Sequence, residues 1–105
     1  MPEISFTQYL MPNGRRKAVT LETTSADVAA LATKLLAAGY HFDAEILMDY
    51  QTVSLTCEPN RPGPDGEDAP VAHEIVGNGP AVLDAVDRLV RAAASAVFGK
   101  SAVAS

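Results

Sequence analysis

The sequence predicts an α+β domain with the element order ββαβββα, a two-layer sandwich in which two helices cover one face of a five-stranded, mostly antiparallel sheet. Three observations predict it: five short segments alternate apolar and polar residues, two longer segments repeat apolar residues every three or four positions, and Gly, Pro and Asn separate them. The chain has 105 residues, 48% hydrophobic and 20% charged, which is the size and composition of one domain. We expect this domain over residues 1–99 and a frayed tail over 100–105.

The first two strands are predicted over residues 3–11 and 17–23, with Asn13-Gly14 between them. Asn-Gly is typical of a two-residue type I′ hairpin turn. Such a turn pairs Phe6 with Leu21 and collects the apolar side chains on one face, whereas a three-residue turn would scatter them over both faces of the sheet. The core face is then expected to contain Ile4, Phe6, Leu10, Val19 and Leu21.

The first helix is predicted directly after this hairpin. Thr24 and Ser25 are typical N-cap residues, and Asp27 follows Thr24 at the spacing of a capping box. Gly39 is expected to end the helix. The apolar residues at helical spacing are Val28, Leu31, Ala32, Leu35 and Leu36.

Residues 41–49 and 52–58 predict a second hairpin, joined by Tyr50-Gln51. Neither Tyr nor Gln readily adopts the positive φ of a type I′ turn, so a longer turn or a bulge is the alternative. A two-residue connection would turn six side chains toward the core, with Met48 opposite Val53, Ile46 opposite Leu55 and Ala44 opposite Cys57.

The last third of the chain predicts a loop, a strand and a helix. Residues 59–70 contain four of the seven prolines, so we expect a mobile loop there. A short strand is predicted over 71–77. It precedes Asn78-Gly79-Pro80, which is typical of a helix start with Pro in the first turn. The second helix is expected to end at Gly99, and its apolar stripe consists of Val82, Leu83, Val86, Leu89, Val90, Ala93 and Val97.

Charge and cysteine content narrow the function classes. The net charge of −5 has the same sign as nucleic acid and anionic membranes, so a basic partner fits better than either. The single cysteine, Cys57, has no second cysteine with which to form an internal disulfide. The chain shows neither a secretory leader nor an apolar run of about 20 residues, so we expect a cytoplasmic protein without a membrane segment.

We expect no catalytic, cofactor-binding or metal-binding residues, and therefore no enzyme. The two histidines, His41 and His73, and the one cysteine lack the spacing of a zinc motif. Cys57 is expected in the core with a raised pKa rather than as a nucleophile. His41, Asp43 and Glu45 share the outward face of one strand, where we expect them to be solvated, because a catalytic carboxylate pair needs a desolvated pocket.

The candidate interaction surface combines the tip of the first hairpin with the uncovered sheet face, and its residues are Tyr9, Met11, Arg15, Arg16, Lys17 and Leu47. Cations at a hairpin tip also serve solubility and prevent edge-to-edge aggregation. An exposed aromatic residue and a thioether beside a guanidinium are, however, typical of protein interfaces. We expect a protein partner, or a second copy of the chain that covers the same face as a homodimer.

The alternative is nucleic-acid binding through Arg15-Arg16-Lys17. Sheets that bind RNA stack bases on two or three aromatic side chains, whereas this face offers only Tyr9. Asp43 and Glu45 on the same face would repel phosphate. The residues therefore favour a non-enzymatic protein-interaction module.

Two segments carry a family resemblance: F-x-Q-Y-L-x-P-N-G-R-R from Phe6 to Arg16, and N-G-P-x-V-x-x-A-V-D-R-L from Asn78 to Leu89. They resemble a group of short bacterial proteins associated with phages and mobile elements, to which no activity is assigned. The resemblance covers nearly the whole chain and transfers no catalytic or binding residue. It implies, at the level of a class, an inhibitor or regulator of a host system, as anti-CRISPR proteins are.

Overall fold

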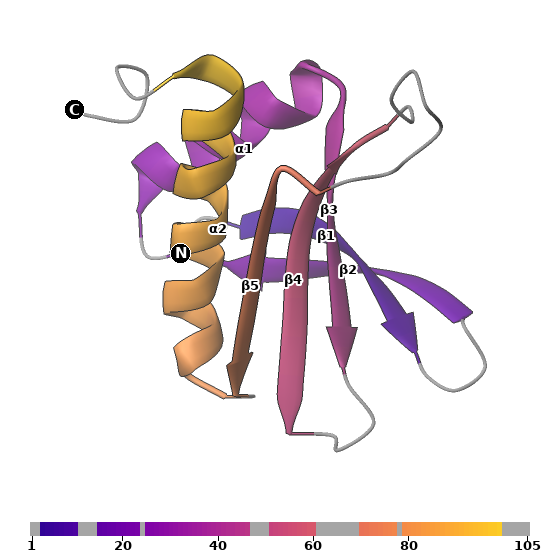
Figure 1. Cartoon of the computed structure of the whole chain (residues 1–105). Helices are drawn as coiled ribbons and strands as arrows, with labels where there is room; N and C mark the ends of the chain where they lie inside the picture. Colours follow the sequence, from indigo (N-terminus) through magenta and orange to yellow (C-terminus); the bar gives the residue numbers. More distant parts are fainter. Residues whose placement is uncertain are drawn as a thin grey trace.

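The computed structural model describes residues 3–10, 15–23, 25–46, 51–60, 70–77 and 79–99. It confirms the α+β class and the order ββαβββα (Figure 1). The loop predicted over residues 59–70 begins later than expected, because the fourth strand continues through Pro59. The elements are β1 Glu3–Leu10, β2 Arg15–Glu22, α1 Ala26–Ala37, β3 Tyr40–Ile46, β4 Thr52–Pro59, β5 Ala72–Gly77 and α2 Ala81–Phe98.

The strands form one sheet in the order β2-β1-β3-β4-β5. Three neighbouring pairs are antiparallel, and only β1 and β3 are parallel. The parallel pair arises because the chain leaves the first hairpin, passes through α1 and returns beside β1 in the same direction. Both helices lie on the same side of the twisted sheet, as predicted (Figure 1).

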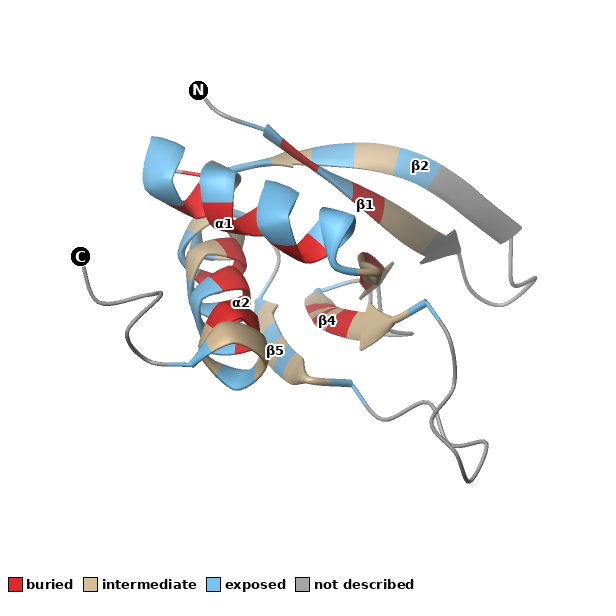
Figure 2. Ribbon diagram, turned by 90° about the horizontal axis from the view of Figure 1, so that it is seen from above, coloured by how far each residue is buried: buried red, intermediate tan, exposed pale blue. Residues whose placement is uncertain are grey.

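The core lies between the helices and the sheet face that they cover (Figure 2). The rings of Phe6 and Phe42, from the parallel strands β1 and β3, pack with their centroids 5.3 Å apart. Leu36, which follows the helical spacing of the apolar residues of α1, is not part of the core, because 41% of it is exposed. It lies about 100° around α1 from Leu35, outside the buried stripe. The core consists of Ile4, Phe6, Val28, Leu31, Ala32, Leu35, Phe42, Ala44, Val53, Leu55, Cys57, Ala85, Val86, Leu89, Val90, Ala93 and Ala94.

The pairing register differs from the prediction by two residues in both hairpins. Phe6 is opposite Val19 rather than Leu21. Ala44 is opposite Leu55 rather than Cys57. A shift of two residues keeps every side chain on its predicted face, because side chains alternate with a period of two. The expected turn centres, Asn13-Gly14 and Tyr50, lie outside the described residues.

A buried hydroxyl joins the end of β2 to both helices. Thr23 is fully buried, and its hydroxyl donates a hydrogen bond to Asp87 of α2. The same oxygen accepts from the backbone N–H of Ser25, at 3.4 Å. Ser25 is the N-cap of α1, and its side chain accepts from the backbone N–H of Asp27 at 3.1 Å. Thr23 therefore connects α2 to the start of α1.

The helix ends agree with the predicted stops. Gly39 and Gly99 follow α1 and α2 with φ of 97° and 92°, a region that Gly adopts without a steric penalty. The start of α2 differs from the prediction, because Pro80 is its N-cap rather than a residue of its first turn and provides no side-chain hydrogen bond. Neither described helix is long and apolar enough to cross a membrane.

Replacement of Thr23 by Val is expected to lower the free energy of unfolding by about 1–3 kcal/mol, because the Asp87 carboxylate loses a buried partner. The matched control is Thr20→Val, on the exposed face of β2, which is expected to change stability by less than about 0.5 kcal/mol. Urea unfolding curves provide the measurement. Equal stability of the two variants would contradict a stabilising role for the buried hydroxyl.

Candidate functional site

The sheet face turned away from the helices is polar. The cross-strand register assigns to it the described side chains of Glu3, Ser5, Thr7, Ala18, Thr20, Glu22, His41, Asp43, Glu45, Thr52, Ser54, Thr56, Glu58, His73 and Ile75. Ile75 is its one large hydrophobic residue with a described side chain, and 62% of it is exposed. We call this surface the open face.

The predicted interaction residues divide between the two faces or lie outside the described part. Tyr9 and Arg16 are opposite each other in the register, at positions of the open face. Arg15 and Lys17 alternate with Arg16 and therefore occupy positions of the opposite face. Met11 and Leu47 lie outside the described residues.

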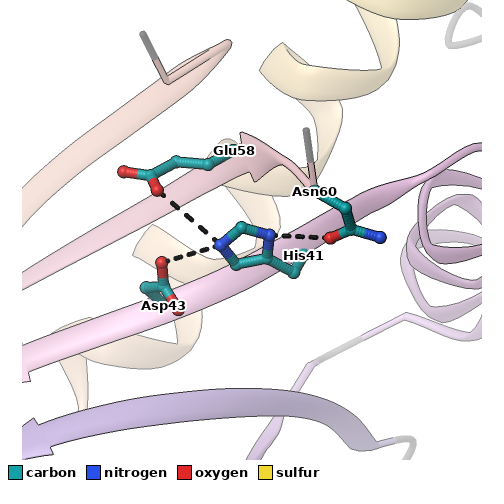
Figure 3. A network of polar contacts seen from close by, with 4 residues as sticks. All are labelled: His41, Asp43, Glu58 and Asn60. Atoms are coloured by element: carbon teal, nitrogen blue, oxygen red, sulfur yellow. Dashed lines mark hydrogen bonds and ion pairs between the residues drawn. The ribbon is translucent and has the colours of Figure 1, made fainter. Parts of the chain in front are cut away.

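Four polar residues meet near one end of the open face (Figure 3). His41 lies opposite Glu58 in the β3–β4 register, and Asp43 is two residues further along β3. The Nε2 atom of His41 lies 3.1 Å from Oδ2 of Asp43 and 3.7 Å from Oε2 of Glu58. Its other ring nitrogen, Nδ1, lies 2.8 Å from Oδ1 of Asn60. We call these residues the His41 cluster.

The burial of Asp43 corrects the expectation of a solvated carboxylate. Only 8% of this residue is exposed, although no helix covers the open face. β3 is an inner strand, and the direct cross-strand neighbours of Asp43 are Thr7 on β1 and Thr56 on β4. Side chains at such positions lie close enough to cover one another. The second oxygen of Asp43, Oδ1, is buried and has no hydrogen-bond partner among the described residues.

Cys57 lies on the opposite side of the same strand pair. It is fully buried in the core, and burial raises the pKa of its thiol from 9.0 to about 12, with smaller contributions from the charges of Asp43 and Glu58. A thiol with such a pKa is protonated and unreactive at neutral pH. The expectation of a structural cysteine with a raised pKa is confirmed.

Two further features, a contact on the open face and a hollow beside it, were not predicted from the sequence. The hydroxyl of Ser54 lies 2.7 Å from Nε2 of His73, but in the described part of the chain no carboxylate orients this exposed histidine, as a catalytic triad requires. A hollow of about 530 Å³ is lined by residues 37–40, Pro59 and Asn60. Because Asn60 also contacts His41, this hollow borders the His41 cluster.

Sequence reasoning found only part of the His41 cluster. The spacing His-x-Asp indicates that His41 and Asp43 share one face of a strand. The predicted register placed Glu58 opposite Asp43, whereas the observed register places it opposite His41. The convergence of the three side chains therefore depends on the correct register, which the alternation of apolar residues does not specify.

Comparison with protein-family models, with curated proteins and with solved structures finds no match for this chain.

The pKa of Cys57 predicts a pH dependence of stability. Because the folded-state pKa of about 12 exceeds the ordinary value of 9.0, this thiol contributes stability that is complete below pH 9 and is lost as the pH rises toward 12. Between these values the free energy of unfolding should fall by up to about 1.4 kcal/mol per pH unit relative to Cys57→Ala. Denaturant unfolding of both proteins across this range measures the difference in slope, and parallel pH profiles would contradict the prediction.

Proposed function

We propose that this chain is a non-enzymatic protein-interaction module that binds a basic protein partner through its open face. The observation that carries the proposal is the separation of charge between the two layers. Every Lys and Arg whose side chain is described lies on a helix, namely Lys34, Arg88 and Arg91. The open face carries the carboxylates of Glu3, Glu22, Asp43, Glu45 and Glu58.

The first hairpin contains a repulsive pair that such a partner would relieve. Glu3 and Glu22 lie directly opposite each other, and both are exposed. Like charges at directly opposed positions destabilise a sheet. A Lys or Arg side chain placed between them would gain two attractive interactions and remove the repulsion, so the pair favours a cationic ligand.

The remaining surface of the open face suits a polar interface. Hydroxyl groups of Ser5, Thr20, Ser54 and Thr56 offer hydrogen bonds in both directions, and Ile75 offers an exposed apolar contact. The carboxylates would speed the approach of a basic partner and select against acidic ones. For the same reason they count against nucleic acid as the ligand of this face. In line with the resemblance to proteins of phages and mobile elements, the proposed partner belongs to a host system, which binding would inhibit or regulate.

A pair of charge-matched variants tests the proposal. Glu22→Gln with Glu45→Gln removes two negative charges from the open face, and Ala30→Lys with Thr33→Lys adds two positive charges to exposed positions of α1, so both change the net charge by +2. Proteins that the wild type captures from a host lysate are identified and purified. The affinity of each is then measured for the wild type and for both double variants. We expect the first variant to bind about tenfold more weakly and the second to bind like the wild type, apart from a general charge effect.

Two results would contradict the proposal. The first is equal loss of affinity in both variants, which would mean that only net charge matters. The second is a wild-type chain that is dimeric by light scattering and becomes monomeric in the open-face variant, because the open face would then be covered by a second copy of the chain rather than by a separate basic partner.

A further inference from the structure

The His41 cluster brings together three atoms of the kind that bind metal ions. One ring nitrogen of His41 and one carboxylate oxygen each of Asp43 and Glu58 lie within 4.8 Å of one another. The two carboxylates come from different strands, and the imidazole lies between them (Figure 3).

The contact with Asn60 determines which atom of the imidazole faces the carboxylates. Oδ1 of Asn60 is a carbonyl oxygen and only accepts hydrogen bonds, so Nδ1 of His41, 2.8 Å away, is the donor. In the neutral ring, Nε2 then carries a lone pair instead of a hydrogen. This lone pair is directed toward the carboxylate oxygens of Asp43 and Glu58, and three lone pairs repel one another unless a cation lies between them.

A divalent cation fits this arrangement better than a proton. A proton on Nε2 is donated in one direction, toward one oxygen, whereas a divalent cation can bind Nε2 and both carboxylate oxygens at once. Oδ1 of Asp43 is buried and lacks a hydrogen-bond partner among the described residues, which is unfavourable for a charged carboxylate unless a cation lies nearby.

Two of the three separations between the ligand atoms are close to those around a small metal ion, and the third, between the two carboxylate oxygens, is at most 4.8 Å. Ligand bonds of about 2.0–2.2 Å in a tetrahedral site place the ligand atoms about 3.3 Å apart. In the cluster, Nε2 lies 3.1 Å from Oδ2 of Asp43 and 3.7 Å from Oε2 of Glu58. The side chain of His41 is 36% exposed, so an ion has access from solvent.

We propose that His41, Asp43 and Glu58 bind a first-row divalent cation of the Zn²⁺ class, with solvent completing its coordination. An imidazole with two carboxylates suits Zn²⁺ better than Mg²⁺ or Ca²⁺, which prefer oxygen ligands alone. Asn60 is a positioning residue, because it holds the ring in the tautomer and orientation that present Nε2 to the ion. This site goes beyond the proposed interaction with a basic protein and does not depend on it.

Calorimetric titration of the full chain with ZnCl₂ tests the proposal, with the second histidine as the control. We expect saturable binding of one Zn²⁺ per chain, and an excess of Mg²⁺ should displace this Zn²⁺ only poorly. His41→Gln should weaken this binding at least about tenfold, whereas His73→Gln, on the same face, should leave it unchanged within about twofold. Histidine side-chain resonances should show Zn²⁺-dependent shifts at His41 and none at His73.

Further variants address folding and the role of Asn60. Because Asp43 is buried, its replacement could disturb the fold, so Glu58→Gln is used to remove a carboxylate from a more exposed position. Asn60→Ala should weaken Zn²⁺ binding about 10–100-fold, and Asn60→Asp, which keeps an acceptor oxygen, should restore most of it. The proposal is overturned if the wild type shows no saturable Zn²⁺ binding, or if folded His41→Gln and Glu58→Gln bind Zn²⁺ as tightly as the wild type.

Discussion

The packing of two helices against one face of the sheet is the interaction on which the rest of the structure depends. Burial of apolar surface is the main favourable contribution to folding, and here both helices contribute their apolar stripes to the same side of the sheet. Each strand must therefore direct alternate side chains toward α1 and α2. The other half of the side chains, including His41 and Asp43, is left on the open face, so the chemistry of that face follows from the same alternation that builds the core.

The position of β3 within the sheet explains why a polar site forms on a face without a covering layer. β3 has β1 on one side and β4 on the other, so Asp43 is enclosed by neighbouring strands and is nearly as buried as a core residue. Edge strands lack this protection, and His73 and Ile75 on β5 are exposed accordingly. A carboxylate can thus be desolvated by its place in the sheet order, without a cleft between domains or a loop that closes over it.

The sheet also separates two environments by the thickness of one backbone layer. Cys57 and Glu58 are consecutive residues of β4, yet the thiol lies in the core and the carboxylate lies on the open face. The negative charges of that face add to the effect of burial in keeping the thiol protonated. The described Lys and Arg side chains lie on the helices, and the open face carries five of the described carboxylates, so a basic partner is expected to be attracted to that side of the sheet.

The sequence by itself determined the type and order of the elements, the core-facing side of the strands in the two hairpins and the stops at Gly39 and Gly99, because these depend on local periodicity and local backbone preference. Only the tertiary structure decided the register of the two hairpins. A shift of two residues leaves the apolar pattern unchanged, so Phe6 opposite Val19 satisfies it as well as Phe6 opposite Leu21. The site depends on that choice, because Glu58 meets His41 only in the observed register, and Asp43 is buried only because strands distant in the sequence lie on both sides of it.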